Sequence, residues 1–153
     1  MRMDPKEELI ERDRSSDKVL LHEPFLLMTY SPGERLIHLE WNGHATSSQY
    51  RSSLELAVNF VAKHDVHLWL ADLRGMTAIL QADETWANEH WFPKLFATPL
   101  EKMAIIHSKD YFNQTSVARS FRKVGGKLTF KVADLTDMKK ALDWLHAREA
   151  VSA

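Results

Sequence analysis

The chain has 153 residues, and 44% of them are hydrophobic, which suits one domain with a core of its own. It contains no cysteine, which excludes disulfides, thiol catalysis and cysteine-ligated metal sites. Its 20 basic and 21 acidic residues give a net charge of -1, so the charge balance favours neither nucleic acid nor an anionic membrane as a partner.

The beginning of the chain is mostly charged and offers little apolar surface. We expect residues 1–20 to form a loose arm or a short peripheral helix, residues 21–148 to form a single α/β domain, and residues 149–153 to form a tail. The arm lacks the apolar stretch of a signal peptide, and no run elsewhere approaches the ~20 apolar residues that span a bilayer. These features predict a cytoplasmic protein without membrane insertion.

Two strands are expected to open the domain, at residues 25–30 and 35–41. Between them, Pro32 and Gly33 suit a type II turn, in which the glycine takes a positive φ. The pattern predicts a half-buried β-hairpin. The second strand alternates between two faces, with Leu36, His38 and Glu40 on one and Ile37, Leu39 and Trp41 on the other.

Helical and extended segments then alternate along the chain. Thr46 and Gln49 have the spacing of a capping box at a helix start, and Asp134 is expected to cap the last helix. Pro93 is expected to kink or restart a helix that runs from about Asp83 past Trp91. The other expected elements are strands at 67–73, 102–107 and 127–132 and helices at 115–124 and 135–145.

This order of elements is typical of an α/β fold. It predicts a mixed, mostly parallel sheet of about four to five strands, opened by the hairpin and covered by about four helices.

Two segments, WLADLRGM at 69–76 and DETWANEHWFPKL at 83–95, carry a family resemblance. Placed after the hairpin and its helix, they resemble the STAS/SEC14-type domains, which are similar to sporulation anti-sigma factor antagonists. The resemblance covers roughly residues 22–147. It implies a sheet with packed helices and a regulatory role through protein binding or, on the SEC14 side, binding of a small apolar ligand.

One departure from that pattern concerns phosphorylation. The phosphorylatable antagonists carry a serine at the start of the helix after the third strand, whereas residues 80–85 here contain no serine. Thr85 is the only hydroxyl, and the neighbouring carboxylates of Asp83 and Glu84 would repel an added phosphate. We therefore do not expect a phosphorylation switch at this position.

Polar residues at two predicted strand ends form a candidate ligand site. Ligands of open α/β sheets gather beyond the carboxyl ends of strands. Asp72 or His107 could act as a general base or acid, and Arg74 or Lys109 could hold an anion, with Asp110 beside them. The alternative is structural: Asp72 caps a turn and pairs with Arg74.

Other chemistry finds little support in the sequence. His64 and His67 span a helix-to-strand junction, and Glu89-His90 lacks the second histidine of a zinc-protease motif, so we expect no metal site. No serine lies in a G-x-S-x-G motif, and the basic residues near Phe121 are expected to form a solvated face rather than a nucleic-acid site. We expect no cofactor and no catalytic residue.

An aromatic segment is the second candidate site, formed by Trp86, His90, Trp91 and Phe92. Trp86 and Trp91 are five residues apart, which is about 140° around a regular helix, so one large ring should lie outside the core. The segment is therefore buried, lines a pocket, or meets a partner or a second copy of the chain. The leading interpretation is a non-enzymatic regulatory or protein-interaction domain; the alternatives are a carrier of a small apolar ligand and a small hydrolase.

Overall fold

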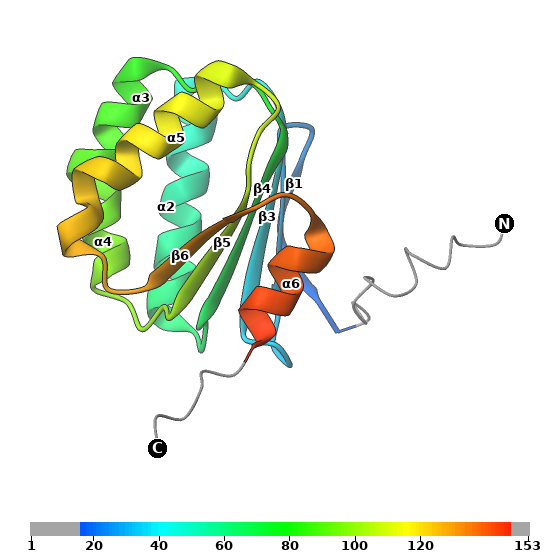
Figure 1. The fold of residues 1–153 in the computed structure, drawn as a ribbon. Helices are drawn as coiled ribbons and strands as arrows, with labels where there is room; N and C mark the ends of the chain where they lie inside the picture. The colour runs from blue at the N-terminus through cyan, green and yellow to red at the C-terminus, as the bar shows by residue number, and fades with distance from the viewer. Residues whose placement is uncertain (1–15, 148–153) are drawn as a thin grey trace, which may run out of the picture.

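A computed structural model describes residues 16–147 as a sheet with helices on both faces (Figure 1). The sheet has six strands in the order β1-β2-β3-β4-β5-β6, so each strand lies beside the next one in sequence. β1, β2 and β3 are antiparallel, and β3 to β6 are parallel. The strands are β1 (Lys18–Glu23), β2 (Leu26–Ser31), β3 (Leu36–Gly43), β4 (Leu68–Met76), β5 (Lys102–Ile106) and β6 (Lys131–Leu135).

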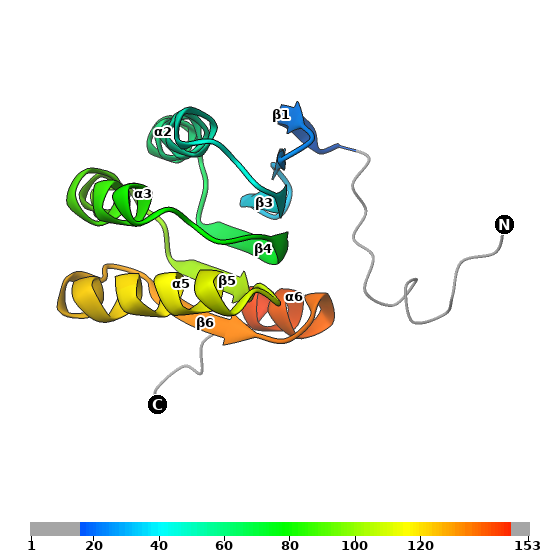
Figure 2. The same ribbon diagram turned by 90° about the horizontal axis from the view of Figure 1, so that it is seen from above.

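The helices are divided unequally between the two faces of the sheet. Within residues 16–147, helices α2, α3, α4 and α5 form a layer on one face, and α6 lies on the other (Figures 1 and 2). Within the described part of the chain, no helix is long and apolar enough to cross a bilayer. The helices are α2 (Ser47–Lys63), α3 (Gln81–Trp86), α4 (Phe92–Phe96), α5 (Tyr111–Val124) and α6 (Met138–His146), with a π-helix η1 (Ala87–Trp91) and a 3-10 turn η2 (Gly125–Lys127).

The predicted mixed, mostly parallel α/β sheet is confirmed, with six strands in place of four to five. The additional strand is β1, which begins at Lys18, inside the segment expected to be an arm. β1 is a short edge strand without a fully buried residue, and its register shifts between Val19 and Leu21. Neither face of β1 is buried in the core, so its sequence does not alternate between apolar and polar residues in the way that identifies a strand. Residues 1–15, which make up most of the predicted arm, and the predicted tail lie outside the described residues.

The predicted turn between β2 and β3 has a different geometry. Gly33 does not have a positive φ; the left-handed residue is Arg35, with a φ of 54°. The Arg35 amide donates to the Pro32 carbonyl at 3.3 Å, which closes the turn one residue later than the proline-glycine pair indicated.

The last strand and its following helix also start later than predicted. Leu128 and Phe130 alternate as in a strand, but β6 begins only at Lys131, after the η2 turn. Asp134 therefore lies inside β6, and the residue that caps α6 is Asp137, whose carboxylate accepts from the Lys140 amide at 2.8 Å. The cap at the start of α2 is as predicted: Thr46 and Gln49 form a reciprocal capping box.

Two apolar clusters, one on each face of the sheet, form the core. The larger one packs odd-numbered residues of β3 and β4, such as Leu39 and Trp69, against α2 to α5. The smaller one packs Leu36 and Leu70 against Leu142 and Leu145 of α6. Strand alternation thus decides which side chains of β3 and β4 face α6.

Candidate functional site

The α3–η1–α4 segment owes its shape to Pro93. Proline has no amide hydrogen and collides with the carbonyl four residues earlier, so a regular helix cannot run through this position. The chain widens into the π-helix η1 immediately before it, and the Phe92 amide donates to the Ala87 carbonyl. Widened turns of this kind re-aim the side chains that they carry.

The four predicted interface residues of this segment separate into two pairs. Trp91 and Phe92 are buried, with exposed fractions of 5%, and the Trp91 indole donates to the Leu54 carbonyl of α2 at 2.8 Å. Trp86 is half-buried beneath the Arg51 guanidinium, and the His90 side chain is 63% exposed. One large ring lies at the edge, as helical spacing indicates, and it is Trp86.

A small cavity lies between this segment and the sheet. Its volume is about 90 Å³, and Trp91 and Phe92 are among its walls. Most of the lining is apolar, contributed by β3, β4 and β5 from below and by α2 and α5 from the sides, while Glu84 and Ser116 add polar atoms at one edge. Trp86 and His90 do not line the cavity.

Two buried carboxylates join α3 to the helices on either side. Asp83 is 2% exposed and accepts from Ser47 and Arg51 of α2, each at 2.9 Å. Glu84 is 6% exposed and accepts from Ser116 and Arg119 of α5, with both contacts to the arginine at 2.7 Å. No local pattern predicts these contacts, because the partners lie more than 30 residues away along the chain.

These ion pairs change the titration of the groups around them. The hydrogen bonds from Arg119 are the largest cause that lowers the pKa of Glu84; burial opposes them, and the Ser116 hydrogen bond adds to them, so the pKa stays below its ordinary value. Burial, followed by the charges of Asp83 and Glu84, raises the pKa of the Tyr50 phenol. Glu84 is therefore a carboxylate, and Tyr50 a neutral phenol, at neutral pH.

Asp72 and Arg74, in the second half of β4, form an ion pair with each other, as the structural alternative in the sequence analysis predicts. Arg74 donates to both Asp72 oxygens through its side chain, at 2.9 and 2.7 Å, and its amide donates to the same carboxylate at 3.2 Å. Burial opposes ionisation of Asp72, but the combined hydrogen bonds and charge of Arg74 outweigh it and lower the pKa of Asp72.

The remaining strand-end candidates lie apart from this pair. Asp72 is the register partner of Ile106, and Ile106 packs against α6. His107 instead contacts Asp134. Asp134 is the register partner of Ile105, which faces the larger helix layer on the opposite side of the sheet. Asp110 caps α5 by accepting from the Asn113 amide at 3.0 Å, and Lys109 is exposed. Asp72 and Arg74 thus contact each other, while His107 and Asp110 have other partners.

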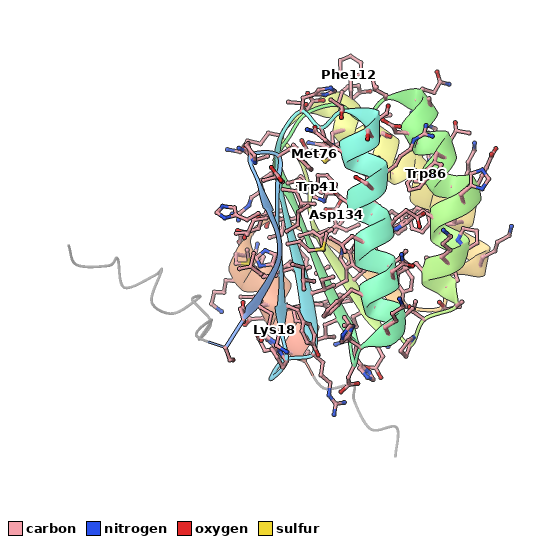
Figure 3. All side chains as sticks on the ribbon, turned by 180° about the vertical axis from the view of Figure 1, so that it is seen from behind. Lys18, Trp41, Met76, Trp86, Phe112 and Asp134 are labelled. Atoms are coloured by element: carbon pink, nitrogen blue, oxygen red, sulfur yellow. The ribbon has the colours of Figure 1, made fainter. Side chains whose placement is uncertain are left out.

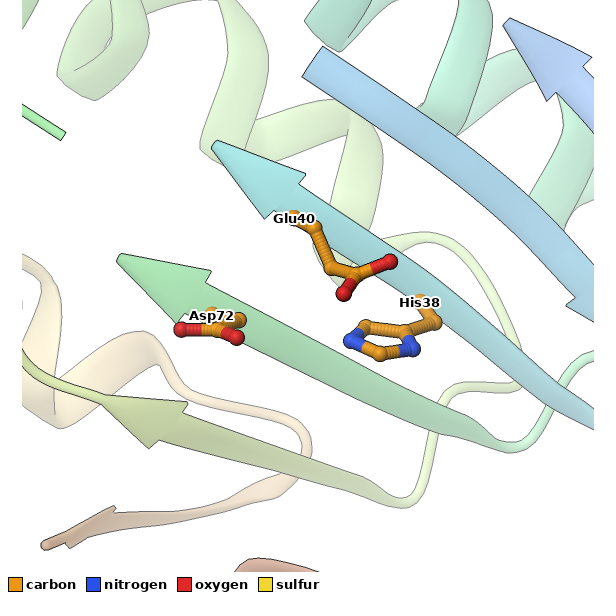
Figure 4. A group of neighbouring side chains, drawn as sticks. All are labelled: His38, Glu40 and Asp72. Carbon is orange, nitrogen blue, oxygen red and sulfur yellow. The ribbon is translucent and has the colours of Figure 1, made fainter. Parts of the chain in front are cut away.

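A second polar group, His38, Glu40 and Asp72, lies on the α6 side of β3 and β4 (Figure 4). A ring nitrogen of His38 and one carboxylate oxygen from each acidic residue lie within 4.8 Å of one another. The alternation of β3 already placed His38 and Glu40 on one face, but the sequence could not tell that Asp72 would pair opposite Glu40.

An exposed aromatic pair begins α5, at the carboxyl end of the parallel strands. Tyr111 and Phe112 are 72% and 71% exposed, and their ring centres lie 5.7 Å apart. Phe112 projects at the end of the molecule opposite Lys18 (Figure 3). The loop before α3 is tied to this place, because the Asn113 side chain donates to the Thr77 carbonyl at 2.8 Å. We call Tyr111 and Phe112 the aromatic tip.

Comparison with known proteins gives a match to the sequence model of a protein family. The sequence model of the SpoIIAA-like family matches residues 36–146, which include β3 to β6 and helices α2 to α6. Neither the search of curated proteins nor the search of solved structures gave a match.

Proposed function

The chain belongs to the SpoIIAA-like family, and from this premise we propose that it is a non-enzymatic, STAS-type regulatory domain that acts by binding another protein through its aromatic tip. The proposal includes a cytoplasmic location, which the lack of cysteine supports.

The exposure of Tyr111 and Phe112 carries this proposal. Two adjacent rings, each more than 70% exposed, are costly to keep in water, and an aromatic ring can bury about 150–250 Å² against a partner. Aromatic residues are typical hot spots of protein interfaces.

Hydrogen bonds beneath the tip hold its backbone in place. Ser108 is fully buried; its hydroxyl donates to the Met76 carbonyl at 2.6 Å and accepts from the Asp110 amide at 2.9 Å. Asp110 then caps the helix on which both rings stand. A surface fixed in this way loses little conformational entropy when a partner binds.

The aromatic segment of α3 to α4 is the weaker candidate for an interface. Trp91 and Phe92 are part of the core, so only Trp86 and His90 remain at the surface. Trp86 is also in contact with the Tyr50 ring and the Arg51 guanidinium. These contacts satisfy most of its apolar surface within the molecule.

The test is site-specific photo-crosslinking in cells, with the crosslinking amino acid at position 112. We expect one protein adduct, identified by mass spectrometry, that is absent when the crosslinker replaces Leu56, an exposed apolar residue of α2. The double variant Tyr111→Ser, Phe112→Ser should bind the identified partner at least about tenfold more weakly, the scale of hot-spot losses, with an unchanged melting temperature.

Two results would overturn the proposal: adducts at position 56 equal to those at position 112, or full affinity in the double variant. An adduct that consists of a second copy of this chain would instead assign the tip to a homodimer. Leu56→Ser is the matched control for the double variant, because it also replaces an exposed apolar side chain by serine.

A second candidate function, carriage of a small apolar ligand, draws on the cavity beneath α3 to α4. At about 90 Å³ this cavity is smaller than the ~150 Å³ that accommodates benzene in an engineered apolar site. A larger ligand requires the helices to move outward. Native mass spectrometry of freshly purified protein tests this function, since a carrier should retain an adduct and a protein-binding domain should have the mass of the polypeptide alone.

A further inference from the structure

We propose that His38, Glu40 and Asp72 form a binding site for one divalent transition-metal ion, for which Zn²⁺ is the natural probe. The three ligand atoms converge within 4.8 Å on the α6 side of the sheet (Figure 4). This site is separate from the aromatic tip, so the two proposals stand or fall independently.

Strand pairing brings the three side chains together. His38 and Glu40 are two residues apart on β3 and so point to the same face, and Glu40 is the register partner of Asp72 on β4. β3 and β4 are the two central strands of the sheet, with neighbours on both sides. A site built on central strands has ligand positions fixed by the backbone hydrogen bonds of the sheet.

The set of donor atoms selects the class of ion. One imidazole nitrogen and two carboxylate oxygens form a mixed donor set, which suits borderline divalent ions such as Zn²⁺ better than Ca²⁺ or Mg²⁺, because those ions prefer oxygen ligands alone. Three protein ligands leave at least one position for water or another ligand, as in open zinc sites.

The charges at this place favour a cation. Two carboxylates directly opposite each other on neighbouring strands repel, and Arg74 supplies one positive charge against them. Arg74 leaves one formal negative charge on the two carboxylates, which a divalent ion more than neutralises.

Small side-chain rotations bring the trio to bonding geometry. Ligand atoms of a tetrahedral zinc site lie about 3.3 Å apart, at bond lengths of about 2.0–2.1 Å. The separations of up to 4.8 Å therefore close by about 1.5 Å or less. His38 and Asp72 are 2% and 7% exposed, while Glu40 is half-buried and reaches the site through flexible torsions.

Arg74 orients Asp72 without preventing it from binding a metal. It donates twice to Oδ1, through its amide and its side chain, and once to Oδ2, so one lone pair stays available on Oδ2. Hydrogen-bonded partners behind the ligands are the rule in metal sites, where they fix ligand orientation.

The experiment titrates the metal-free full-length protein with Zn²⁺ by calorimetry and with Co²⁺ by visible absorption. We expect one high-affinity site per chain, a d–d spectrum of low-symmetry cobalt, and a melting temperature that rises with excess Zn²⁺. His38→Gln and Glu40→Gln should each lower the affinity by at least about tenfold and abolish the cobalt spectrum.

The matched control is His107→Gln, which removes the histidine of an exposed histidine–carboxylate pair, His107–Asp134, at 2.7 Å. This variant should bind Zn²⁺ like the wild type. Glu40→Gln keeps the size of the side chain, so it carries the test if His38→Gln fails to fold. Absence of tight binding in the wild type, or equal affinity in wild type and Glu40→Gln, would sink the proposal.

Discussion

Gly43, the last residue of β3, has a φ of 67°, in the left-handed region that favours glycine. Arg35, at the other end of the strand, has a φ of 54° with a full side chain. β3 thus lies between two left-handed residues. The backbone, rather than the side-chain environment, is what constrains Gly43, since an added Cβ would meet nothing within 4 Å.

Gly43→Ala tests this constraint. We expect it to lower the free energy of unfolding by about 1 kcal/mol, because an L-residue pays that cost in the left-handed region. Gly33→Ala is the control: it also has open space around it, but its φ lies outside that region, so it should be neutral or stabilise slightly. Chemical denaturation of both variants measures the difference. Equal effects would mean that Gly43 can relax to a negative φ.

At the scale of elements, α3 is a helix of six residues held on both sides by ion pairs. Asp83 joins it to α2, and Glu84 joins it to α5. A helix of six residues has little stability of its own, so these contacts and the burial of Trp91 just beyond it fix its place. The same arrangement makes the attachment of α3 sensitive to acid.

Glu84→Gln should lower the free energy of unfolding by about 1–2 kcal/mol at pH 7, because it weakens the bonds that Arg119 and Ser116 make. The pKa of Glu84 is lower in the folded protein, so its contribution is present above the ordinary value of 4.5 and is lost as the pH falls through the folded value. The stability difference between wild type and variant should therefore shrink below about pH 4.5.

Urea denaturation between pH 3 and pH 7 measures this difference. Asp143→Asn, which removes the exposed Lys139–Asp143 pair, is the control and should change stability little at any pH. A difference between wild type and Glu84→Gln that is independent of pH would show that packing, rather than charge, is lost.

Local patterns in the sequence were enough to predict many elements. The Thr46–Gln49 box starts α2, β5 starts at Lys102 as predicted, and the apolar stripe of the last helix packs through Ala141, Leu142 and Leu145. β1 was missed because an exposed edge strand needs no alternation. The π-helix was missed because Pro93 signals a break without saying how the chain accommodates it.

The candidate sites depended on distant pairing and were harder to predict. The Asp72–Arg74 pair is local, and the sequence indicated it correctly as the structural alternative. The structure places His107 beside Asp134, away from the Asp72–Arg74 pair, and this placement follows from the strand register, which the sequence does not reveal. The group of His38, Glu40 and Asp72 depends on that same register.

At the scale of the whole molecule, the helix layer does not fill the space above the sheet. A cavity of about 90 Å³ remains between β4, β5 and the α3–η1–α4 segment. Ala71 is buried at its floor, where larger side chains would fit into the free volume.

Ala71→Val should therefore raise the free energy of unfolding by about 0.5–2 kcal/mol, the usual range for filling a cavity. Thermal unfolding measures it, with Ala104→Val as the control, since Ala104 packs on the other face beneath α6 and should lose stability through overpacking. Destabilisation by Ala71→Val would mean that the cavity walls cannot accept two more methyl groups.

The sequential order of the sheet has a consequence for protein synthesis. Each strand lies beside the one that precedes it, so every new strand meets a finished edge as it leaves the ribosome and none waits for a later one. The 25 residues between the end of β4 at Met76 and the start of β5 at Lys102 are translated in about 1–5 s. The growing edge of the nascent sheet is thus open to wrong pairing for only those few seconds at each step.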